Sequence, residues 1–322
     1  MDTPLWVPRA EDSWRSPLEA DFSNLEAVGH ALANAAPSSQ PCLPLRVLGT
    51  GYYSVAVETP SGCVFLLALA REVGERHQRV AQLLPWVAGQ LPDPVPVPQW
   101  TIPPGSAFPY GALGYRKLTG QPLTAELFDH LDHRQLAQDL AGFIYRLHEV
   151  SPSEAQRYGA APPDQVDREL RQISADLLAI LATRVTPQFH DRVATWWAEL
   201  FADPQMREFE PVLTHGDLGN TNLLVDSMSG HLRGVLDWEF AAVGDPAVDF
   251  QQLGDPGTPL QDAVLDAYVA LGGRISGDAH YRLHRYWQMG PTWGIRMAER
   301  RRDESLVVQH IERLRRQLQF DR

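Results

Sequence analysis

The sequence of 322 residues contains two cysteines, one lysine and no long apolar run, and each shortage excludes a class of protein. Cys42 and Cys63 are too few for a thiolate zinc site or a disulfide framework, so reduced thiols are expected, although a single pairing stays open. The longest apolar run, residues 63–70, is too short to span a bilayer. Residues 1–20 lack the basic segment and apolar core of a secretory signal. We therefore expect a cytoplasmic protein that does not insert into membranes.

An excess of positive charge is also absent. Forty acidic residues against 28 lysines and arginines give a net charge of -12. Such a charge opposes binding to a polyanion, so neither nucleic acid nor an anionic membrane is an expected partner. It suits a cationic small molecule, although solubility alone explains an acidic composition. The 44% of hydrophobic residues is typical of a folded globular chain.

The hydrophobic pattern divides the chain into a strand-rich and a helix-rich part. Residues 45–70 alternate apolar and polar positions around glycine turns, which predicts antiparallel strands, and another strand is expected at 112–115. Helical spacing predicts a helix over 78–91, followed by an extended connector with four prolines. Further on, helices are expected over 136–147, 165–183, 189–201 and 261–320, around a β-rich island at 212–250. The fold class predicted is α+β.

Polar residues are concentrated in this island, between apolar segments. One group is His215-Gly-Asp217-x-x-x-x-Asn222, and another is Asp237-Trp238 at the end of a predicted strand. Polar groups in such surroundings need partners, which indicates a site. Carboxylate and amide oxygens suit a hard cation such as Mg²⁺, and a carboxylate left free of metal can accept the proton of a hydroxyl.

These two linked motifs resemble the aminoglycoside phosphotransferase family, including its choline kinase-like members, which are small-molecule relatives of protein kinases. The resemblance implies a protein kinase-like, two-lobe α+β fold. It places a small antiparallel, β-rich N-lobe at 1–115, a hinge at 116–121 and a mainly helical C-lobe at 122–322. Within the C-lobe, the catalytic loop would be 213–225 and the metal segment 234–250.

The resemblance also implies roles for individual residues. Asp217 would be the base, His215 would brace the catalytic loop, and Asn222 and Asp237 would bind Mg²⁺. Asp245 and Asp249 would be supporting acids. The nucleotide, ATP or GTP, would lie against the loop that holds Gly49, Gly51 and Ser54 and against the hinge backbone at Arg116, Lys117 and Leu118. From the residues alone, an ordinary turn at 49–51, a plain interdomain linker and turn-capping aspartates are the alternatives.

The chain departs from the family pattern at one pair of positions. Kinase-like enzymes carry a lysine or arginine on the third strand and a glutamate on the following helix. Here the strand position is Leu66 or Ala68, and the helix position is Val80. Arg71, Arg76 or Arg79 could reach the site, but solvent-exposed arginines are the simpler expectation.

The predicted function is the Mg²⁺-dependent transfer of the γ-phosphoryl group of ATP or GTP to a hydroxyl of a small molecule. An aminoglycoside-like compound or another amino or sugar alcohol is the expected acceptor. The absent ion pair leaves a pseudokinase, or a weakly active binding module, as the alternative. A metal-dependent hydrolase would need more ligands than the island offers. Glu239 is expected to face the acceptor or to form a surface salt bridge. The sequence does not decide the acceptor, the choice of nucleotide or the oligomeric state.

Overall fold

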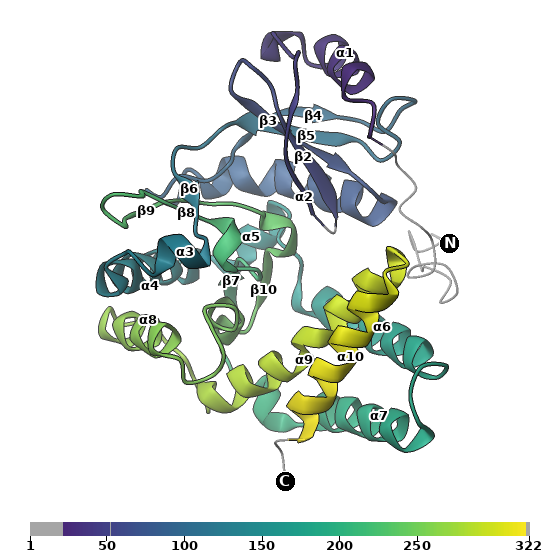
Figure 1. The fold of residues 1–322 in the computed structure, drawn as a ribbon. Coiled ribbons are helices and arrows are strands. Elements are labelled where there is room, and N and C mark those ends of the chain that lie inside the picture. Colours follow the sequence, from purple (N-terminus) through teal and green to yellow (C-terminus); the bar gives the residue numbers. More distant parts are fainter. Residues whose placement is uncertain (1–21, 52, 320–322) are drawn as a thin grey trace, which may run out of the picture.

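A computed structural model describes residues 22–51 and 53–319 of the chain. Figure 1 shows a β-sheet at one end of the molecule and a larger group of helices at the other. The sheet has five antiparallel strands in the order β1-β2-β3-β5-β4. The strands are β1 (Arg46–Thr50), β2 (Ser54–Glu58), β3 (Cys63–Ala68), β4 (Pro98–Ile102) and β5 (Ala112–Arg116). The strands expected over 45–70 and 112–115 are found, whereas β4 was not predicted.

Two helices cover the sheet on opposite faces (Figure 1). On one face lie α1 (Leu25–Ala35), capped by the Asn24 side chain, and the short η1 (Pro37–Ser39). On the other face lies α2 (Arg71–Val87), which begins earlier and ends earlier than the predicted helix over 78–91. The polar first turns of α2 hide its start from a periodicity argument. They are fixed by close packing, since a Cβ at Gly74 would lie 2.2 Å from the Tyr110 carbonyl oxygen.

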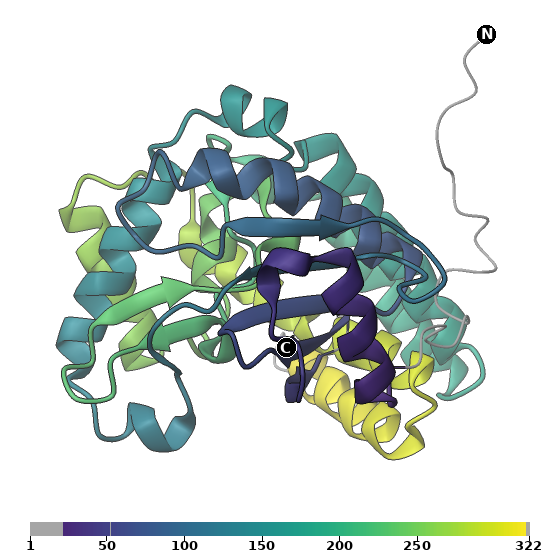
Figure 2. The same cartoon turned by 90° about the horizontal axis from the view of Figure 1, so that it is seen from above.

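The rest of the chain is mainly helical, and its helices form two groups that lie apart in both views (Figures 1 and 2). One group consists of α3 (Ala125–Phe128), α4 (His133–His148) and α8 (Pro259–Ala270). The other consists of α6 (Pro163–Leu181), α7 (Pro187–Ala202), α9 (Ala279–Arg300) and α10 (Glu304–Gln319), with η2 (Pro204–Arg207) after α7. Helix α5 (Pro152–Arg157) precedes α6. The helix expected over 261–320 is interrupted twice, at Gly272 and at Arg302, where φ is positive.

Short strands between the helix groups hold the polar loops. β6 (Gln121–Pro122), β8 (Leu223–Val225) and β9 (Leu232–Val235) form one small sheet, and β7 (Val212–Thr214) pairs with β10 (Ala242–Gly244). Three short 3-10 helices lie next to these strands in the chain: η3 (Asn220–Asn222), η4 (Trp238–Phe240) and η5 (Pro246–Phe250). The segments 215–222 and 236–241 are therefore anchored at both ends.

The largest apolar cluster connects the sheet to the helices. It contains Val80 and Leu84 of α2, Leu113 of β5, Leu140 of α4 and Trp238 of η4. Burial of this shared surface holds α2 and the polar segments in a fixed relation. In the part of the chain that the structure describes, no helix has the length and apolar character needed to cross a bilayer.

Candidate active site

The loop 215–222 is held by a buried carboxylate. Asp249 in η5 is fully buried, and its two oxygens accept hydrogen bonds from the backbone amides of His215 at 3.0 Å and Gly216 at 2.8 Å. The same carboxylate lies 3.1 Å from Nε2 of His148 on α4. This is the supporting position expected for Asp249. It fixes the backbone immediately before Asp217.

His215 connects that loop to the segment that carries Asp237. Its Nε2 lies 2.9 Å from the Leu236 carbonyl oxygen, and its Nδ1 accepts a 3.2 Å hydrogen bond from the Asp217 amide. These partners assign the neutral tautomer with the proton on Nε2. Burial lowers the pKa of His215, which agrees with that form. His215 thus connects the Asp217 amide to the Leu236 carbonyl oxygen.

Asp217 lies near the start of this loop, and its carboxylate has two amide donors. Its Oδ2 accepts a 2.9 Å hydrogen bond from Nδ2 of Asn222, which also donates to the Asp217 carbonyl oxygen. Its Oδ1 accepts a hydrogen bond from Nε2 of Gln252, a residue that the sequence analysis did not select. Burial raises the pKa of Asp217, while His215 and the two amide donors act in the opposite direction.

Asp237 carries a buried oxygen without a partner. Its backbone is left-handed, with φ 62°, and its Oδ1 forms no hydrogen bond among the described residues. Burial, and then the charges of Glu239 and Asp217, raise the pKa of Asp237 well above its usual value. The neighbouring Leu236 amide donates to the Asn222 carbonyl oxygen at 2.8 Å, so both predicted metal ligands belong to one hydrogen-bonded unit.

This donor set fits a magnesium ion that is shared with phosphate oxygens. The described residues contain no group of three His, Cys, Asp or Glu side chains arranged for a metal. Mg²⁺ commonly takes only one or two protein carboxylates and completes its shell with phosphates and water. The unpartnered oxygen of Asp237 and the amide of Asn222 match that requirement, since a buried carboxylate is costly without a cation.

Of the predicted glycine loop, Gly49 lies in β1, Gly51 follows that strand and Ser54 begins β2. The Gly51 amide donates to the Ser54 carbonyl oxygen at 3.0 Å, and a Cβ at Gly49 would meet no atom within 4 Å. Open space at Gly49 suits the approach of a ligand to the backbone. The Ser54 hydroxyl, however, points to the contact between α2 and η4, where it lies 3.2 Å from His77 and 3.3 Å from Glu239.

At the predicted hinge, two side chains turn back to the sheet. Nζ of Lys117 donates to Glu58 at 3.0 Å, and Nη1 of Arg116 donates to the Ser61 carbonyl oxygen at 3.2 Å. Leu118 lies against the backbone of Gly234. The Lys117 backbone amide also donates to the sheet, to the Gly62 carbonyl oxygen at 3.0 Å.

At the positions where the family pattern has its ion pair, the structure has apolar side chains beside the site. Leu66 and Val80 line a small cavity of about 20 Å³ together with Tyr115 and Asp237. Arg76 does not line this cavity. The expectation that Arg76 is exposed to solvent is nevertheless wrong. The Arg76 side chain is 15% exposed and lies over the rings of Tyr53 and Phe240, at 5.2 and 4.6 Å.

The surface salt bridge expected for Glu239 is wrong as well, whereas contact with an acceptor stays a prediction for this residue. Its side chain is 5% exposed, and Oε1 lies 2.9 Å from Nε2 of His77 on α2. No sequence signal selects His77, because a lone histidine on an amphipathic helix is more often a packed residue. The contact joins residues 162 positions apart, so only the fold reveals it.

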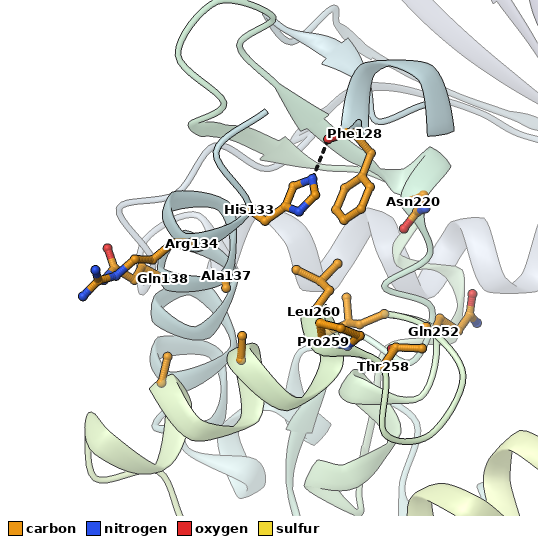
Figure 3. Close-up of a pocket in the computed structure, with 14 residues that line it drawn as sticks. Phe128, His133, Arg134, Ala137, Gln138, Asn220, Gln252, Thr258, Pro259 and Leu260 are labelled. Atoms are coloured by element: carbon orange, nitrogen blue, oxygen red, sulfur yellow. Dashed lines mark hydrogen bonds between the residues drawn. The ribbon is translucent and has the colours of Figure 1, made fainter. Parts of the chain in front are cut away.

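Two cavities flank the loop that carries Asp217. One has a volume of about 740 Å³ between α3, α4 and α8, reaches the loop at Asn220 and is also lined by Gln252. Figure 3 shows its mainly apolar wall, with Phe128 and Leu260 facing the cavity. The other, of about 270 Å³, lies between α2, α6 and α9 and touches the loop at Gly216. Either is large enough for a small molecule or part of one.

Comparison with known proteins agrees with this geometry. The model of the phosphotransferase enzyme family APH matches residues 45–287. The chain belongs to this family. The match includes the glycine loop, the hinge, the segment with His215 and Asp217, and Asp237. This phosphotransferase is therefore an enzyme by family, which agrees with the prediction.

A curated relative and solved structures are similar to the chain. The viomycin phosphotransferase of Streptomyces vinaceus is 27% identical over 142 residues, which are 44% of this chain and 45% of that protein, so the match spans less than half of either. The GDP complex of wild-type aminoglycoside 2'-phosphotransferase-IIIa has a TM-score of 0.76 at 20% identity and covers 93% of this chain and 100% of that one.

A second solved structure, the macrolide 2'-phosphotransferase MphH from Brachybacterium faecium, has a TM-score of 0.62 at 24% identity. It covers 90% of this chain and 97% of that one. At these identities the likeness is one of fold. The kinase-like α+β fold, with a β-rich N-terminal part and a helical C-terminal part, is confirmed.

Proposed function

We propose that this phosphotransferase moves the γ-phosphoryl group of ATP or GTP to a hydroxyl of a small molecule, with Mg²⁺. One observation carries the proposal: Asn222 contacts the carboxylate of Asp217 and is bonded through its backbone to the segment of Asp237, whose own carboxylate oxygen is buried without a partner. A proton acceptor and a candidate cation ligand thus lie in one hydrogen-bonded unit.

In this mechanism, Asp217 accepts the proton of the acceptor hydroxyl as that oxygen bonds to the γ-phosphorus. The bond from the γ-phosphorus to the β,γ-bridging oxygen breaks, and the nucleoside diphosphate leaves. Asn222 and Asp237 would hold Mg²⁺, which neutralises phosphate charge when bound. Asp249 and His215 keep Asp217 and Asp237 in place through the backbone contacts described above.

The nucleotide is proposed to lie between an N-lobe at 1–115 and a C-lobe at 122–322. Backbone amides of the loop with Gly49, Gly51 and Ser54 would approach the phosphates, and the hinge backbone at 116–118 would hold the purine. The GDP complex of the aminoglycoside relative supports a nucleotide in this fold.

The acceptor is proposed to enter through the larger cavity. Gln252 lines that cavity and donates to Oδ1 of Asp217, so the cavity opens next to the proposed base. A hydroxyl that displaces the Gln252 amide would reach the carboxylate directly. The viomycin, aminoglycoside and macrolide enzymes named above support an aminoglycoside-like or other amino or sugar alcohol acceptor.

A second candidate is a pseudokinase or a weakly active nucleotide-binding module. It is favoured by the apolar residues at the positions of the strand cation and helix glutamate, Leu66 and Val80. Both candidates allow a nucleotide to bind, so nucleotide binding does not distinguish them. The rate of phosphoryl transfer does.

Transfer to a panel of hydroxyl compounds tests the proposal. The unmodified protein should add one phosphoryl group to at least one compound from ATP or GTP with Mg²⁺, detected by mass spectrometry. Asp217→Asn should remove that activity and spare nucleotide binding, whereas Asp191→Asn, at an exposed position on α7, should leave both unchanged. Full turnover by Asp217→Asn would refute its role as base.

A further inference from the structure

Three side chains, two of them buried, meet where the two parts of the molecule touch. Nε2 of His77 on α2 lies 2.9 Å from Oε1 of Glu239 in η4, and the Ser54 hydroxyl at the start of β2 lies 3.2 Å from His77 and 3.3 Å from Glu239. The side chains of His77 and Glu239 are only 4% and 5% exposed. The glycine loop, helix α2 and the metal segment are therefore connected by one hydrogen-bonded cluster.

This cluster stands beside the apolar positions where the family pattern has its ion pair. Leu66, Val80 and Tyr115 line the same small cavity as His77, Glu239 and Asp237. A strand cation paired with a helix carboxylate would connect two elements of the β-rich part to each other. Here helix α2 instead supplies the imidazole of His77. The carboxylate is that of Glu239, which follows Asp237 by two residues in the metal segment.

We propose that His77 is a positioning residue: it holds Glu239, and through Glu239 the turn that aims Asp237 at the metal, against the β-rich part. The inference rests on the proposed function and explains how the site works without the strand cation. Asp237 has a left-handed backbone, which a non-glycine residue adopts only where its surroundings fix it. Glu239 follows in η4, and among the described residues its side-chain hydrogen bonds are those with His77 and Ser54.

The test compares His77→Leu with His77→Gln, in which the side-chain amide can still donate to Glu239. Calorimetry measures the Kd of ATP and of GTP with and without Mg²⁺. We expect His77→Leu to weaken magnesium-dependent binding roughly 10- to 100-fold, the range for partners that orient metal ligands, and to leave metal-free binding unchanged. His77→Gln should stay near the wild-type Kd. Gln78→Leu, an exposed neighbour on α2, is the control and should change neither value.

A double variant separates positioning from folding. His77→Leu alone leaves the buried carboxylate of Glu239 with the Ser54 hydroxyl but without the imidazole, which destabilises the fold. His77→Leu with Glu239→Leu removes both polar groups, and apolar replacement of a buried pair is often neutral for stability. We expect the double variant to recover the thermal unfolding midpoint but not the magnesium-dependent affinity.

The outcomes distinguish this inference from the proposed function. Wild-type magnesium-dependent affinity in His77→Leu, or in the double variant, would show that the cluster serves folding alone and would overturn the inference. No magnesium-dependent binding by the unmodified protein would overturn the proposed function, and the inference with it. Weak binding in both leucine variants with near-normal binding in His77→Gln supports the positioning role.

Discussion

The carboxylate of Asp249 accepts a 2.8 Å hydrogen bond from the backbone amide of Gly216, the residue directly before the proposed base. Gly216 has φ 83°, and a Cβ there would lie 2.6 Å from the Phe240 carbonyl oxygen. The loop therefore needs both the glycine and the buried acid to hold its path. The position of Asp217 is set by backbone contacts and not by its own side chain alone.

Asp249→Asn should lower both stability and turnover. One oxygen of the asparagine can still accept an amide hydrogen bond, but its NH₂ group would face the second backbone donor. The loss of a buried bond to a charged acceptor predicts a decrease of about 1.5–3 kcal/mol in the free energy of unfolding, measured by chemical denaturation. Asp266→Asn, on an exposed position of α8, is the control. Equal stability of Asp249→Asn and wild type would contradict this account.

Asp237→Asn should stabilise the metal-free protein while removing its response to magnesium. The substitution removes a buried charge that Glu239 and Asp217 repel, and asparagine tolerates the left-handed backbone. We expect a gain of about 0.5–2 kcal/mol in unfolding free energy, the range common for single stabilising substitutions. Thermal unfolding with nucleotide, with and without Mg²⁺, gives both readouts. A less stable variant would mean that the carboxylate has a structural partner.

Filling the larger cavity should impair use of the acceptor. Ala263 on α8 is exposed and lines this cavity, so Ala263→Phe narrows it without disturbing the core. We expect about a tenfold rise in KM for the acceptor found in the transfer assay, equivalent to roughly 1.4 kcal/mol. Val166→Phe, which narrows the smaller cavity, is the matched comparison. If Val166→Phe raises KM and Ala263→Phe does not, the acceptor binds on the other side of the loop.

The protein should lose stability in alkali. Burial raises the pKa of Tyr115, Tyr268 and Tyr286 above the ordinary value of 10.0, and Asp245 adds to the effect at Tyr286. As pH rises, these phenols lose their protons at lower pH in the unfolded chain than in the folded protein. Their contribution to the free energy of unfolding is therefore complete below pH 10 and decreases as pH rises above it. Unfolding midpoints measured across this range should fall less steeply in Tyr286→Phe, although that variant loses the 2.8 Å bond to Asp245. An unchanged slope would show that Tyr286 titrates normally.

Local sequence signals predicted much of the fold and the centre of the site. The strands over 45–70 follow from alternation and turn residues, which act over a few positions. His215, Asp217, Asn222 and Asp237 lie in two short motifs, and the small strands around them bring both motifs together. The start of α2 was missed because its polar first turns are held by contact with a distant loop at Tyr110.

The remaining site residues depend on contacts that no local pattern contains. His77 and Gln252 each reach the site from another element, and Glu239 is buried only because α2 covers it. The same cause applies to Arg76, which lies over rings contributed by two separate segments. Single-sequence periodicity places a residue on a helix face but does not say what packs against that face.

Calorimetric titration of the unmodified protein with ATP and with GTP, each with and without Mg²⁺, tests the central claim most directly, because it needs no knowledge of the acceptor. The account predicts that at least one nucleotide binds, and that binding is tighter with Mg²⁺ through Asn222 and Asp237. Asp237→Asn should remove the effect of the metal. Failure of both nucleotides to bind in the presence of Mg²⁺ would contradict the proposal that this site operates without its strand cation.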